Sequence, residues 1–158
     1  MKKLLILTLA VLSFAACNQM AKPQAQEQSV QILPIESFNF DKTINQKPVV
    51  VAFMAGFCGW CKKMLPYMDD LAGQVPSTQA EVIIAFMDDN PSTLVDLEPV
   101  KSAKNIKIYY NASELMQKNG VDGFPTIMLF KDGEPVETWR GYSPDHVAGI
   151  LEALKELK

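Results

Sequence analysis

Two cysteines three residues apart, Cys58 and Cys61, are the residues of this sequence best suited to chemistry. A β-branched and apolar run over residues 49–54 precedes them, and apolar side chains at helical spacing follow them. We therefore expect the pair on the first turn of a helix, close enough to form a small disulfide ring. The unpaired N–H groups and positive dipole end of a helix start favour a thiolate at Cys58, the exposed first position. Thiolates attack disulfides, so the pattern indicates redox chemistry.

Structural roles for this Cys-x-x-Cys pair are less well supported. A structural zinc site usually takes four ligands, and only Cys17 and His146 remain as further cysteine or histidine residues. An inert disulfide suits an exported protein, but so short a loop restricts the unfolded chain least, so the stabilisation is small. We expect no bound metal and no cofactor.

The N-terminus resembles a bacterial lipoprotein signal. A basic start is followed by an apolar run over residues 4–16, which is too short to span a bilayer as a mature helix. Ala15 and Ala16 then precede Cys17, the expected lipidation site, although Phe14 stands where such signals usually have leucine. An ordinary secretory signal with an unrelated cysteine is the alternative. Either signal exports the protein to a compartment where disulfides matter.

The rest of the chain fits one folded domain on a tether. We expect a signal peptide at residues 1–16, a polar and flexible tether at 17–29, and a domain at 30–158. The 158 residues, 48% hydrophobic and 21% charged, suffice for a proper core, and no second apolar segment is long enough to cross a membrane. A net charge of −3 gives no support for nucleic-acid binding. The predicted location is the bacterial cell envelope, on the periplasmic side, lipid-anchored to a membrane.

Predicted strands and helices alternate around the cysteine pair. Strands are expected at 30–34, 49–54, 81–87, 106–110, 126–130 and 135–139, the last two as a hairpin. Helices are expected at 58–75, 92–102, 113–119 and 143–158, with a short helix or turn at 37–45. Ser92 and Ser143 are the expected N-caps of two of these helices. The alternation predicts a layered α/β fold with the antiparallel hairpin at one edge of the sheet.

Several motifs resemble the thioredoxin superfamily over residues 45–158. They are Phe53, Ala55 and Phe57 before the cysteines, Pro66 inside the following helix, Asp88-x-Asn90-Pro91 after the next strand, Gly123-Phe124-Pro125-Thr126, and Gly133 and Gly141 beyond it. The resemblance implies the thioredoxin fold, a central mixed sheet flanked by helices. It also implies a cis peptide bond before Pro125 and a backbone at Phe124 that pairs with the extended chain of a substrate.

Two departures from the family pattern carry information. Where thioredoxins bury an aspartate paired with a lysine, this sequence has Ala52 and Ile84, so the usual proton acceptor for Cys61 is missing. Losing both charges together is physically coherent, since one unpaired buried charge is costly. The chain between Pro91 and Pro125 is also longer than in a minimal thioredoxin, which predicts an inserted helix–strand unit near residues 92–110. This insertion resembles the exported, membrane-tethered TlpA/ResA-like thioredoxins.

The resemblance implies a thiol–disulfide oxidoreductase. We expect Cys58 to attack a substrate disulfide and Cys61 to resolve the mixed disulfide, with reduction of exported proteins favoured, as in cytochrome c maturation. The expected partners are exported protein thiols or disulfides and a membrane-embedded thiol reductant, and the protein is expected to be a monomer. A disulfide oxidase or isomerase is one alternative. A copper-binding thioredoxin-fold metallochaperone is another, because soft thiolates suit Cu(I).

The remaining aromatic and basic residues receive simpler predictions. Trp60 is expected to be exposed and to contact substrate with Phe124 and Pro125. Tyr142 is predicted to pack at the sheet edge, and His146 is predicted to be a surface residue away from the cysteines.

Overall fold

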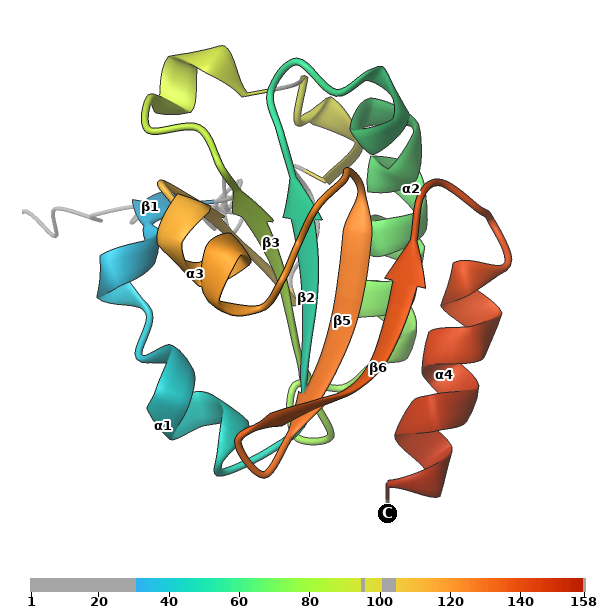
Figure 1. The fold of residues 1–158 in the computed structure, drawn as a ribbon. Helices are drawn as coiled ribbons and strands as arrows, with labels where there is room; N and C mark the ends of the chain where they lie inside the picture. The colour runs from blue at the N-terminus through green and yellow to red at the C-terminus, as the bar shows by residue number, and fades with distance from the viewer. Residues whose placement is uncertain (1–30, 95, 101–104, 158) are drawn as a thin grey trace, which may run out of the picture.

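The computed structural model describes residues 31–94, 96–100 and 105–157 (Figure 1). The predicted signal peptide, the lipidation site Cys17 and the predicted tether lie outside these residues. In the part of the chain that is described, no helix is both long and apolar enough to cross a membrane.

A six-stranded mixed sheet forms the centre of the molecule, with strand order β1-β4-β3-β2-β5-β6. The strands are β1 (Ile32–Pro34), β2 (Val49–Met54), β3 (Glu81–Phe86), β4 (Ile106–Tyr110), β5 (Thr126–Lys131) and β6 (Glu134–Arg140). Strands β1, β4, β3 and β2 run parallel to one another, whereas β5 is antiparallel to both β2 and β6. The predicted mixed sheet and edge hairpin are confirmed.

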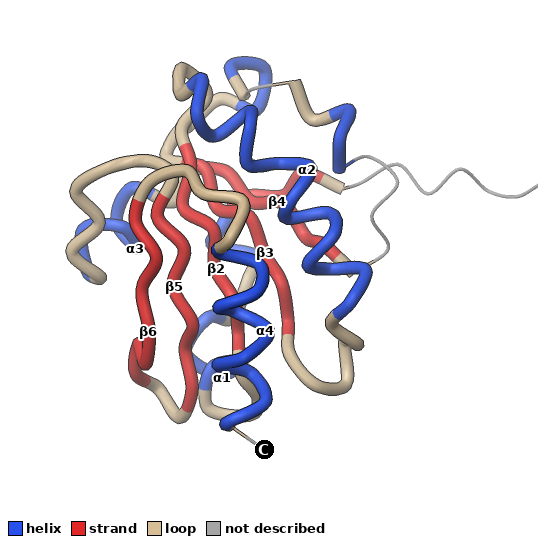
Figure 2. Tube along the Cα trace, turned by 90° about the vertical axis from the view of Figure 1, so that its right-hand side faces the viewer, coloured by secondary structure: helices blue, strands red, loops and turns tan. Residues whose placement is uncertain are grey.

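Helices cover both faces of this sheet (Figure 1, Figure 2). They are α1 (Phe40–Ile44), α2 (Gly59–Gln74), α3 (Ser113–Lys118) and α4 (His146–Glu156). Alternate residues of β2 pack in opposite directions: Val50, Ala52 and Met54 join the core beneath α2 and α4, and Val49, Val51 and Phe53 join the core beneath α1 and α3. Burial on both faces explains why β2 is an uninterrupted apolar run.

The predicted insertion contributes a strand but no α-helix. Strand β4 lies between β3 and β1 and runs parallel to both, as expected for residues 106–110. The helix predicted at residues 92–102 is wrong, because the described part of this segment forms only two 3₁₀ turns, Pro91–Thr93 and Glu98–Val100. Asn90 rather than Ser92 is the cap, since its side chain accepts a hydrogen bond from the Ser92 N–H at 2.9 Å. Pro99 removes an N–H group that a longer helix would need, whereas Pro91 occupies the first helical position, where proline is tolerated.

The last helix begins later than predicted. Helix α4 starts at His146, so Ser143 is not its N-cap. The Ser143 hydroxyl oxygen instead accepts a hydrogen bond from the Asp145 N–H at 3.2 Å, and the Ser143 carbonyl accepts one from the His146 N–H at 3.3 Å. Ser143 therefore closes a turn ahead of the helix, which leaves residues 141–145 as a loop.

Candidate active site

Because of the strand register, four loops lie close together where the central strands end. Phe53 near the end of β2 pairs with Thr126 at the start of β5, and Thr126 pairs with Arg140 at the end of β6. Residues 55–58, 123–125 and 141–143 therefore leave the sheet side by side. Strand β3 ends beside β2, which brings residues 87–93 to the same edge.

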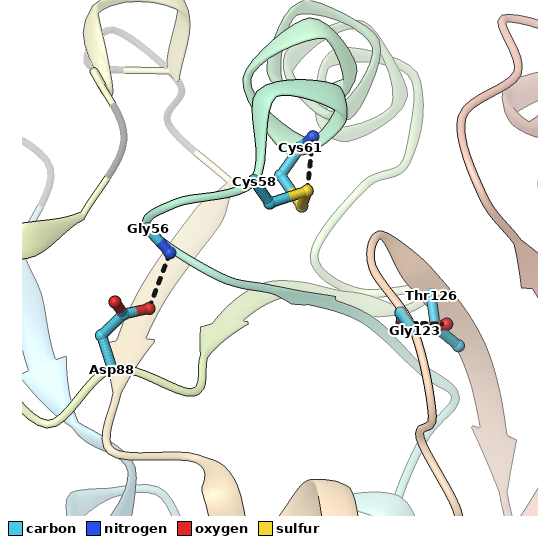
Figure 3. The surroundings of a disulfide bond; sticks show 6 residues. All are labelled: Gly56, Cys58, Cys61, Asp88, Gly123 and Thr126. Atoms are coloured by element: carbon cyan, nitrogen blue, oxygen red, sulfur yellow. Dashed lines mark hydrogen bonds between the residues drawn. A yellow bond between two sulfur atoms is a disulfide. The ribbon is translucent and has the colours of Figure 1, made fainter.

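Cys58 and Cys61 form a disulfide at the start of α2, with 5.2 Å between their Cα atoms (Figure 3). Cys58 is the N-cap residue, and its Sγ accepts a hydrogen bond from the Cys61 N–H at 3.0 Å. Cys58 keeps 8% of its surface exposed, whereas Cys61 is completely buried. A sulfur that caps a helix N-terminus lies where a negative charge is stabilised, so the geometry favours a thiolate at Cys58.

The loop before Cys58 is held by the segment that follows β3. The Gly56 N–H donates a hydrogen bond to Asp88 Oδ2 at 2.7 Å (Figure 3), and the Thr93 hydroxyl donates one to Asp88 Oδ1 at 3.3 Å. A Cβ atom on Gly56 would lie 2.0 Å from the Thr93 carbonyl oxygen, so only glycine fits. The resemblance had marked the motif at Asp88, but not its contact with the active-site loop.

The apolar pair predicted from sequence register is confirmed. Ala52 on β2 is the register partner of Ile84 on β3, and both are completely buried. No carboxylate therefore occupies this position beneath the cysteines. Among the described residues, no cluster of three or more His, Cys, Asp or Glu side chains could hold a metal ion.

Aromatic side chains flank the disulfide on two sides. Phe57 is 80% exposed and makes an edge contact with Phe124, with 6.3 Å between ring centroids. Trp60 is 56% exposed, as predicted, and its indole stacks on Tyr142 at 5.6 Å with the rings 24° apart. Exposed aromatic rings therefore stand at positions 57 and 60, next to Cys58 in the chain, which is the more exposed cysteine of the disulfide.

Tyr142 was not among the predicted site residues. It was predicted to pack at the sheet edge, and the prediction did not include its contacts with aromatic residues of α2. Besides Trp60, it contacts Tyr67 of α2 in an edge-to-face geometry at 5.9 Å. A hydrogen bond with the Tyr67 hydroxyl raises the pKa of Tyr142 above its ordinary value. His146, predicted to be a surface residue, is partly exposed, and its Nε2 lies 3.1 Å from the Gly141 carbonyl oxygen.

The loop before β5 has the features that the resemblance implied. The peptide bond between Phe124 and Pro125 is cis. The Thr126 hydroxyl donates a hydrogen bond to the Gly123 carbonyl at 2.8 Å (Figure 3), and the Gly141 N–H donates one to the Pro125 carbonyl at 2.8 Å. The second bond joins this loop to the loop that carries Tyr142.

The two lysines after the cysteine pair have other partners. Lys62 forms an exposed ion pair with Asp96 at 3.6 Å. The Lys63 ammonium lies over the Trp60 ring, 4.3 Å from its centroid. A surface pair of this kind contributes little, so the helix N-terminus remains the main local influence on Cys58.

The sheet order, the flanking helices and the disulfide at a helix N-terminus define a thioredoxin-fold redox protein. The family model described as thioredoxin matches residues 31–114. The thioredoxin of Staphylococcus haemolyticus is 30% identical over 122 residues, which cover 77% of this chain and 95% of that protein. The chain therefore belongs to the thioredoxin family and is a thiol–disulfide oxidoreductase with Cys58 and Cys61 as its Cys-x-x-Cys pair.

Solved structures of bacterial proteins share the fold. The exposed lipoprotein thioredoxin Etrx1 of Streptococcus pneumoniae superposes with a TM-score of 0.58 at 23% identity, covering 73% of this chain and 88% of that chain. StoA of Bacillus subtilis superposes with a TM-score of 0.54 at 22% identity, covering 69% and 82%. At these identities the similarity concerns the fold.

Proposed function

We propose that this protein is an exported, membrane-tethered reductase of protein disulfides, with Cys58 as the nucleophile and Cys61 as the resolving thiol. The observation that carries the proposal is the asymmetry of the pair. Cys58 caps the helix and is accessible, whereas Cys61 is completely buried and donates its N–H to the Cys58 sulfur. A substrate therefore meets Cys58 first.

The reaction is two successive thiol–disulfide exchanges. The Cys58 thiolate attacks one sulfur of the substrate disulfide, a mixed disulfide forms, and the other substrate sulfur leaves as a thiolate that takes up a proton. Cys61 then loses its proton and attacks the Cys58 sulfur, which forms the Cys58–Cys61 disulfide and releases the second substrate thiolate. The second substrate thiolate takes up a proton from solvent, equivalent to the one that Cys58 released on forming its thiolate. The substrate thus gains two electrons from the two cysteines and two protons, and the protein is left with the disulfide. Because Ala52 and Ile84 are apolar, the Cys61 proton passes to water or to a carboxylate elsewhere.

Substrate binding is assigned to Trp60, Phe124 and Pro125, as the resemblance implies. Phe124 lies beside the exposed ring of Phe57, and Trp60, between the two cysteines in the chain, is also exposed. Within the described residues, no hydrogen bond occupies the backbone of Phe124. That backbone is therefore available to pair with an extended segment of a substrate protein.

The proposed setting is the periplasmic side of a bacterial membrane. Residues 1–16 are the proposed signal peptide, Cys17 the lipid-modified residue and 17–29 the tether, which leaves 30–158 as the redox domain. The similarity of the fold to an exposed lipoprotein thioredoxin supports this setting. A membrane-embedded thiol donor would return electrons to the Cys58–Cys61 disulfide, and cytochrome c maturation is one process with such a need.

Substrate trapping in cells tests the function, because a variant without the resolving thiol cannot release its substrate. In the Cys61→Ala variant, mixed disulfides with exported proteins should accumulate through Cys58, detected on non-reducing gels and identified by mass spectrometry. The Cys58→Ser variant is the matched control and should trap none.

Two measurements on the purified protein test the direction and the alternative. A glutathione redox titration should give a potential reducing enough for disulfide reduction, whereas a strongly oxidising value would favour the oxidase. A stoichiometric Cu(I) complex of the reduced protein, without disulfide reductase activity, would contradict the proposal and favour a metallochaperone.

The anchor has its own test. Replacing Cys17 with Ser should move the protein from the membrane fraction to the soluble periplasmic fraction, because the lipid-bearing thiol is lost. Unchanged membrane association of the Cys17→Ser variant would contradict a lipid anchor at this residue.

A further inference from the structure

The Trp60 side chain, in the first turn of α2, contacts a residue that lies outside this helix. Its indole stacks on Tyr142, with 5.6 Å between centroids, and Lys63 places its ammonium 4.3 Å from the centroid of the indole. Tyr142 in turn contacts Tyr67 in an edge-to-face geometry, with 5.9 Å between ring centroids. An offset stack between large rings contributes beyond the area that it buries. The indole is therefore restrained although 56% of the residue is exposed.

The loop that carries Tyr142 is itself fastened at Gly141. The Gly141 N–H donates to the Pro125 carbonyl at 2.8 Å, and His146 Nε2 is 3.1 Å from the Gly141 carbonyl oxygen. Gly141 has a φ of 73°, a left-handed conformation that glycine adopts without strain. These contacts fix the loop against the Phe124–Pro125 loop on one side and α4 on the other. Tyr142 is thus a rigid support for Trp60.

Phe57, the residue before Cys58, is less restrained than Trp60. Phe57 is 80% exposed, and its only ring contact among the described residues is the edge contact with Phe124 at 6.3 Å. The two exposed rings near Cys58 therefore differ: Trp60 is stacked on a supported ring, whereas Phe57 presents most of its surface to solvent.

We propose that Tyr142 is a positioning residue that determines specificity: it holds the Trp60 indole as a fixed wall, so that a substrate chain reaches Cys58 from the side of Phe57 and Phe124. The assignment rests on the proposed disulfide exchange. The substrate class that follows is an extended protein segment with a bulky apolar side chain on one flank of its cysteine and a small residue on the flank that faces the wall. A segment that is bulky on both flanks should be a poor substrate.

Two variants of Tyr142 separate the ring stack from the hydroxyl. Tyr142→Phe keeps the stack and loses the hydrogen bond with Tyr67, whereas Tyr142→Ala loses both. Both are made in a Trp139→Phe background, so that Trp60 is the single tryptophan and its emission can be excited selectively over that of the tyrosines. Acrylamide quenching of Trp60 in the oxidised protein should increase in Tyr142→Ala and stay at the parent value in Tyr142→Phe.

Exchange kinetics with two disulfide-linked peptides test the specificity. One peptide has a leucine on a single flank of its cysteine, and the other has bulky apolar residues on both flanks. Tyr142→Ala should raise kcat/KM for the second peptide by about tenfold, the scale of discrimination that a steric contact provides, and leave the first unchanged. Tyr142→Phe should match the parent with both peptides.

Unchanged Trp60 quenching in Tyr142→Ala, or an equal effect on the two peptides, would overturn the assignment. The quenching result does not depend on turnover, so it tests the support of Trp60 separately from the proposed function. A parent protein that exchanges with neither peptide would instead overturn the proposed function, and the specificity assignment with it.

Discussion

Cys58 and Cys61 differ in every property that matters for exchange. The Cys58 sulfur caps the helix, and that residue keeps 8% of its surface exposed, whereas Cys61 is completely buried. Below them, Ala52 and Ile84 fill the position where the family resemblance implies a buried ion pair. Deprotonation of Cys61 therefore receives no help from a carboxylate at that position. The apolar pair also means that no buried charge there has to be compensated.

Restoring one charge alone should be damaging. Ala52→Asp places a carboxylate in a completely buried site, and we expect a loss of about 3 kcal/mol or more in the free energy of unfolding at pH 7. Burial raises the pKa of such a group, so the loss should shrink as pH falls below its folded-state value. Urea unfolding at pH 7 and pH 4 measures both effects.

The double variant is the control for that substitution. Ile84→Lys added to Ala52→Asp should recover part of the stability, because the two positions are register partners on adjacent strands. An Ala52→Asp variant as stable as the parent at pH 7 would contradict a dry, apolar site beneath the cysteines.

Residues whose role follows from local sequence could be predicted, and those that act across the fold could not. Cys58, Cys61 and the Ala52–Ile84 pair follow from spacing and from the register of two apolar strands. Tyr142 could not be connected with Trp60 because their contact depends on where β6 ends relative to α2. The glycine that precedes Tyr142, Gly141, was the one hint in the sequence of a constrained loop, and its φ is indeed positive.

At the scale of elements, the added strand and its connection shape the active-site loop. Strand β4 widens the sheet, and the 3₁₀ turn at Pro91–Thr93 packs its backbone against Gly56. Asp88 binds the same glycine through its N–H group. The segment that leads into Cys58 is therefore positioned by residues that follow the neighbouring strand.

The close approach of Gly56 to Thr93 predicts a large effect when one methyl group is added at position 56. Gly56→Ala would place a Cβ atom 2.0 Å from the Thr93 carbonyl oxygen, so one of the two loops must move. We expect a loss of about 1–3 kcal/mol in unfolding free energy, as in overpacked sites, and slower reaction of reduced Cys58 with iodoacetamide. Chemical denaturation and alkylation rates measure the two effects.

Gly73 provides the matched control. It lies within α2, and a Cβ atom there would have no neighbour within 4 Å. Gly73→Ala should stabilise the protein by about 0.5–1 kcal/mol through helix propensity and leave the alkylation rate unchanged. Equal behaviour of the Gly56→Ala and Gly73→Ala variants would show that the close approach at Gly56 has no role.

Elements with strong apolar periodicity were predictable, and short capped turns were not. Strands β2 and β3 and helix α2 lie within a residue or two of their predicted bounds, because each has an uninterrupted buried run or stripe. The segment around Pro91–Thr93 carries cap residues that suit a helix equally well. Its conformation is decided by the contact with Gly56, which is distant in sequence.

On the scale of the whole molecule, the ion pairs of Glu81 and the cysteine pair lie at opposite ends of the central strands. Glu81 begins β3 beside Val49 at the start of β2, whereas the cysteines follow the end of β2. Lys47 contacts the Glu81 carboxylate at 2.9 Å, and Lys107 hydrogen-bonds to it as well. Burial works to raise the pKa of Glu81, but the hydrogen bonds and charges of these lysines outweigh it and hold the pKa below its ordinary value.

This cluster makes stability depend on pH in a defined direction. A carboxyl whose folded-state pKa is lowered contributes stability above its unfolded-state value, about 4.5, and that contribution is lost as pH falls through the folded-state value. Glu81→Gln should therefore reduce the urea midpoint at pH 7 and have a smaller effect at pH 3. The effect should be about 1 kcal/mol, because both lysines are partly exposed.

Glu152 on the exposed face of α4 is the matched control for the acid dependence. Glu152→Gln should shift the midpoint little at either pH. If Glu81→Gln has the same effect at pH 7 and pH 3, the ion pairs do not contribute in the folded state.

The most direct test compares how fast each of the two cysteines captures one half of the same disulfide-linked peptide. Reduced Cys61→Ala and reduced Cys58→Ala are mixed separately with the peptide, and intact-protein mass spectrometry follows the mixed disulfide over time. We expect rapid capture of one peptide half by Cys58 in Cys61→Ala and far slower capture in Cys58→Ala, because Cys61 is buried. Equal capture rates in the two variants would contradict this expectation.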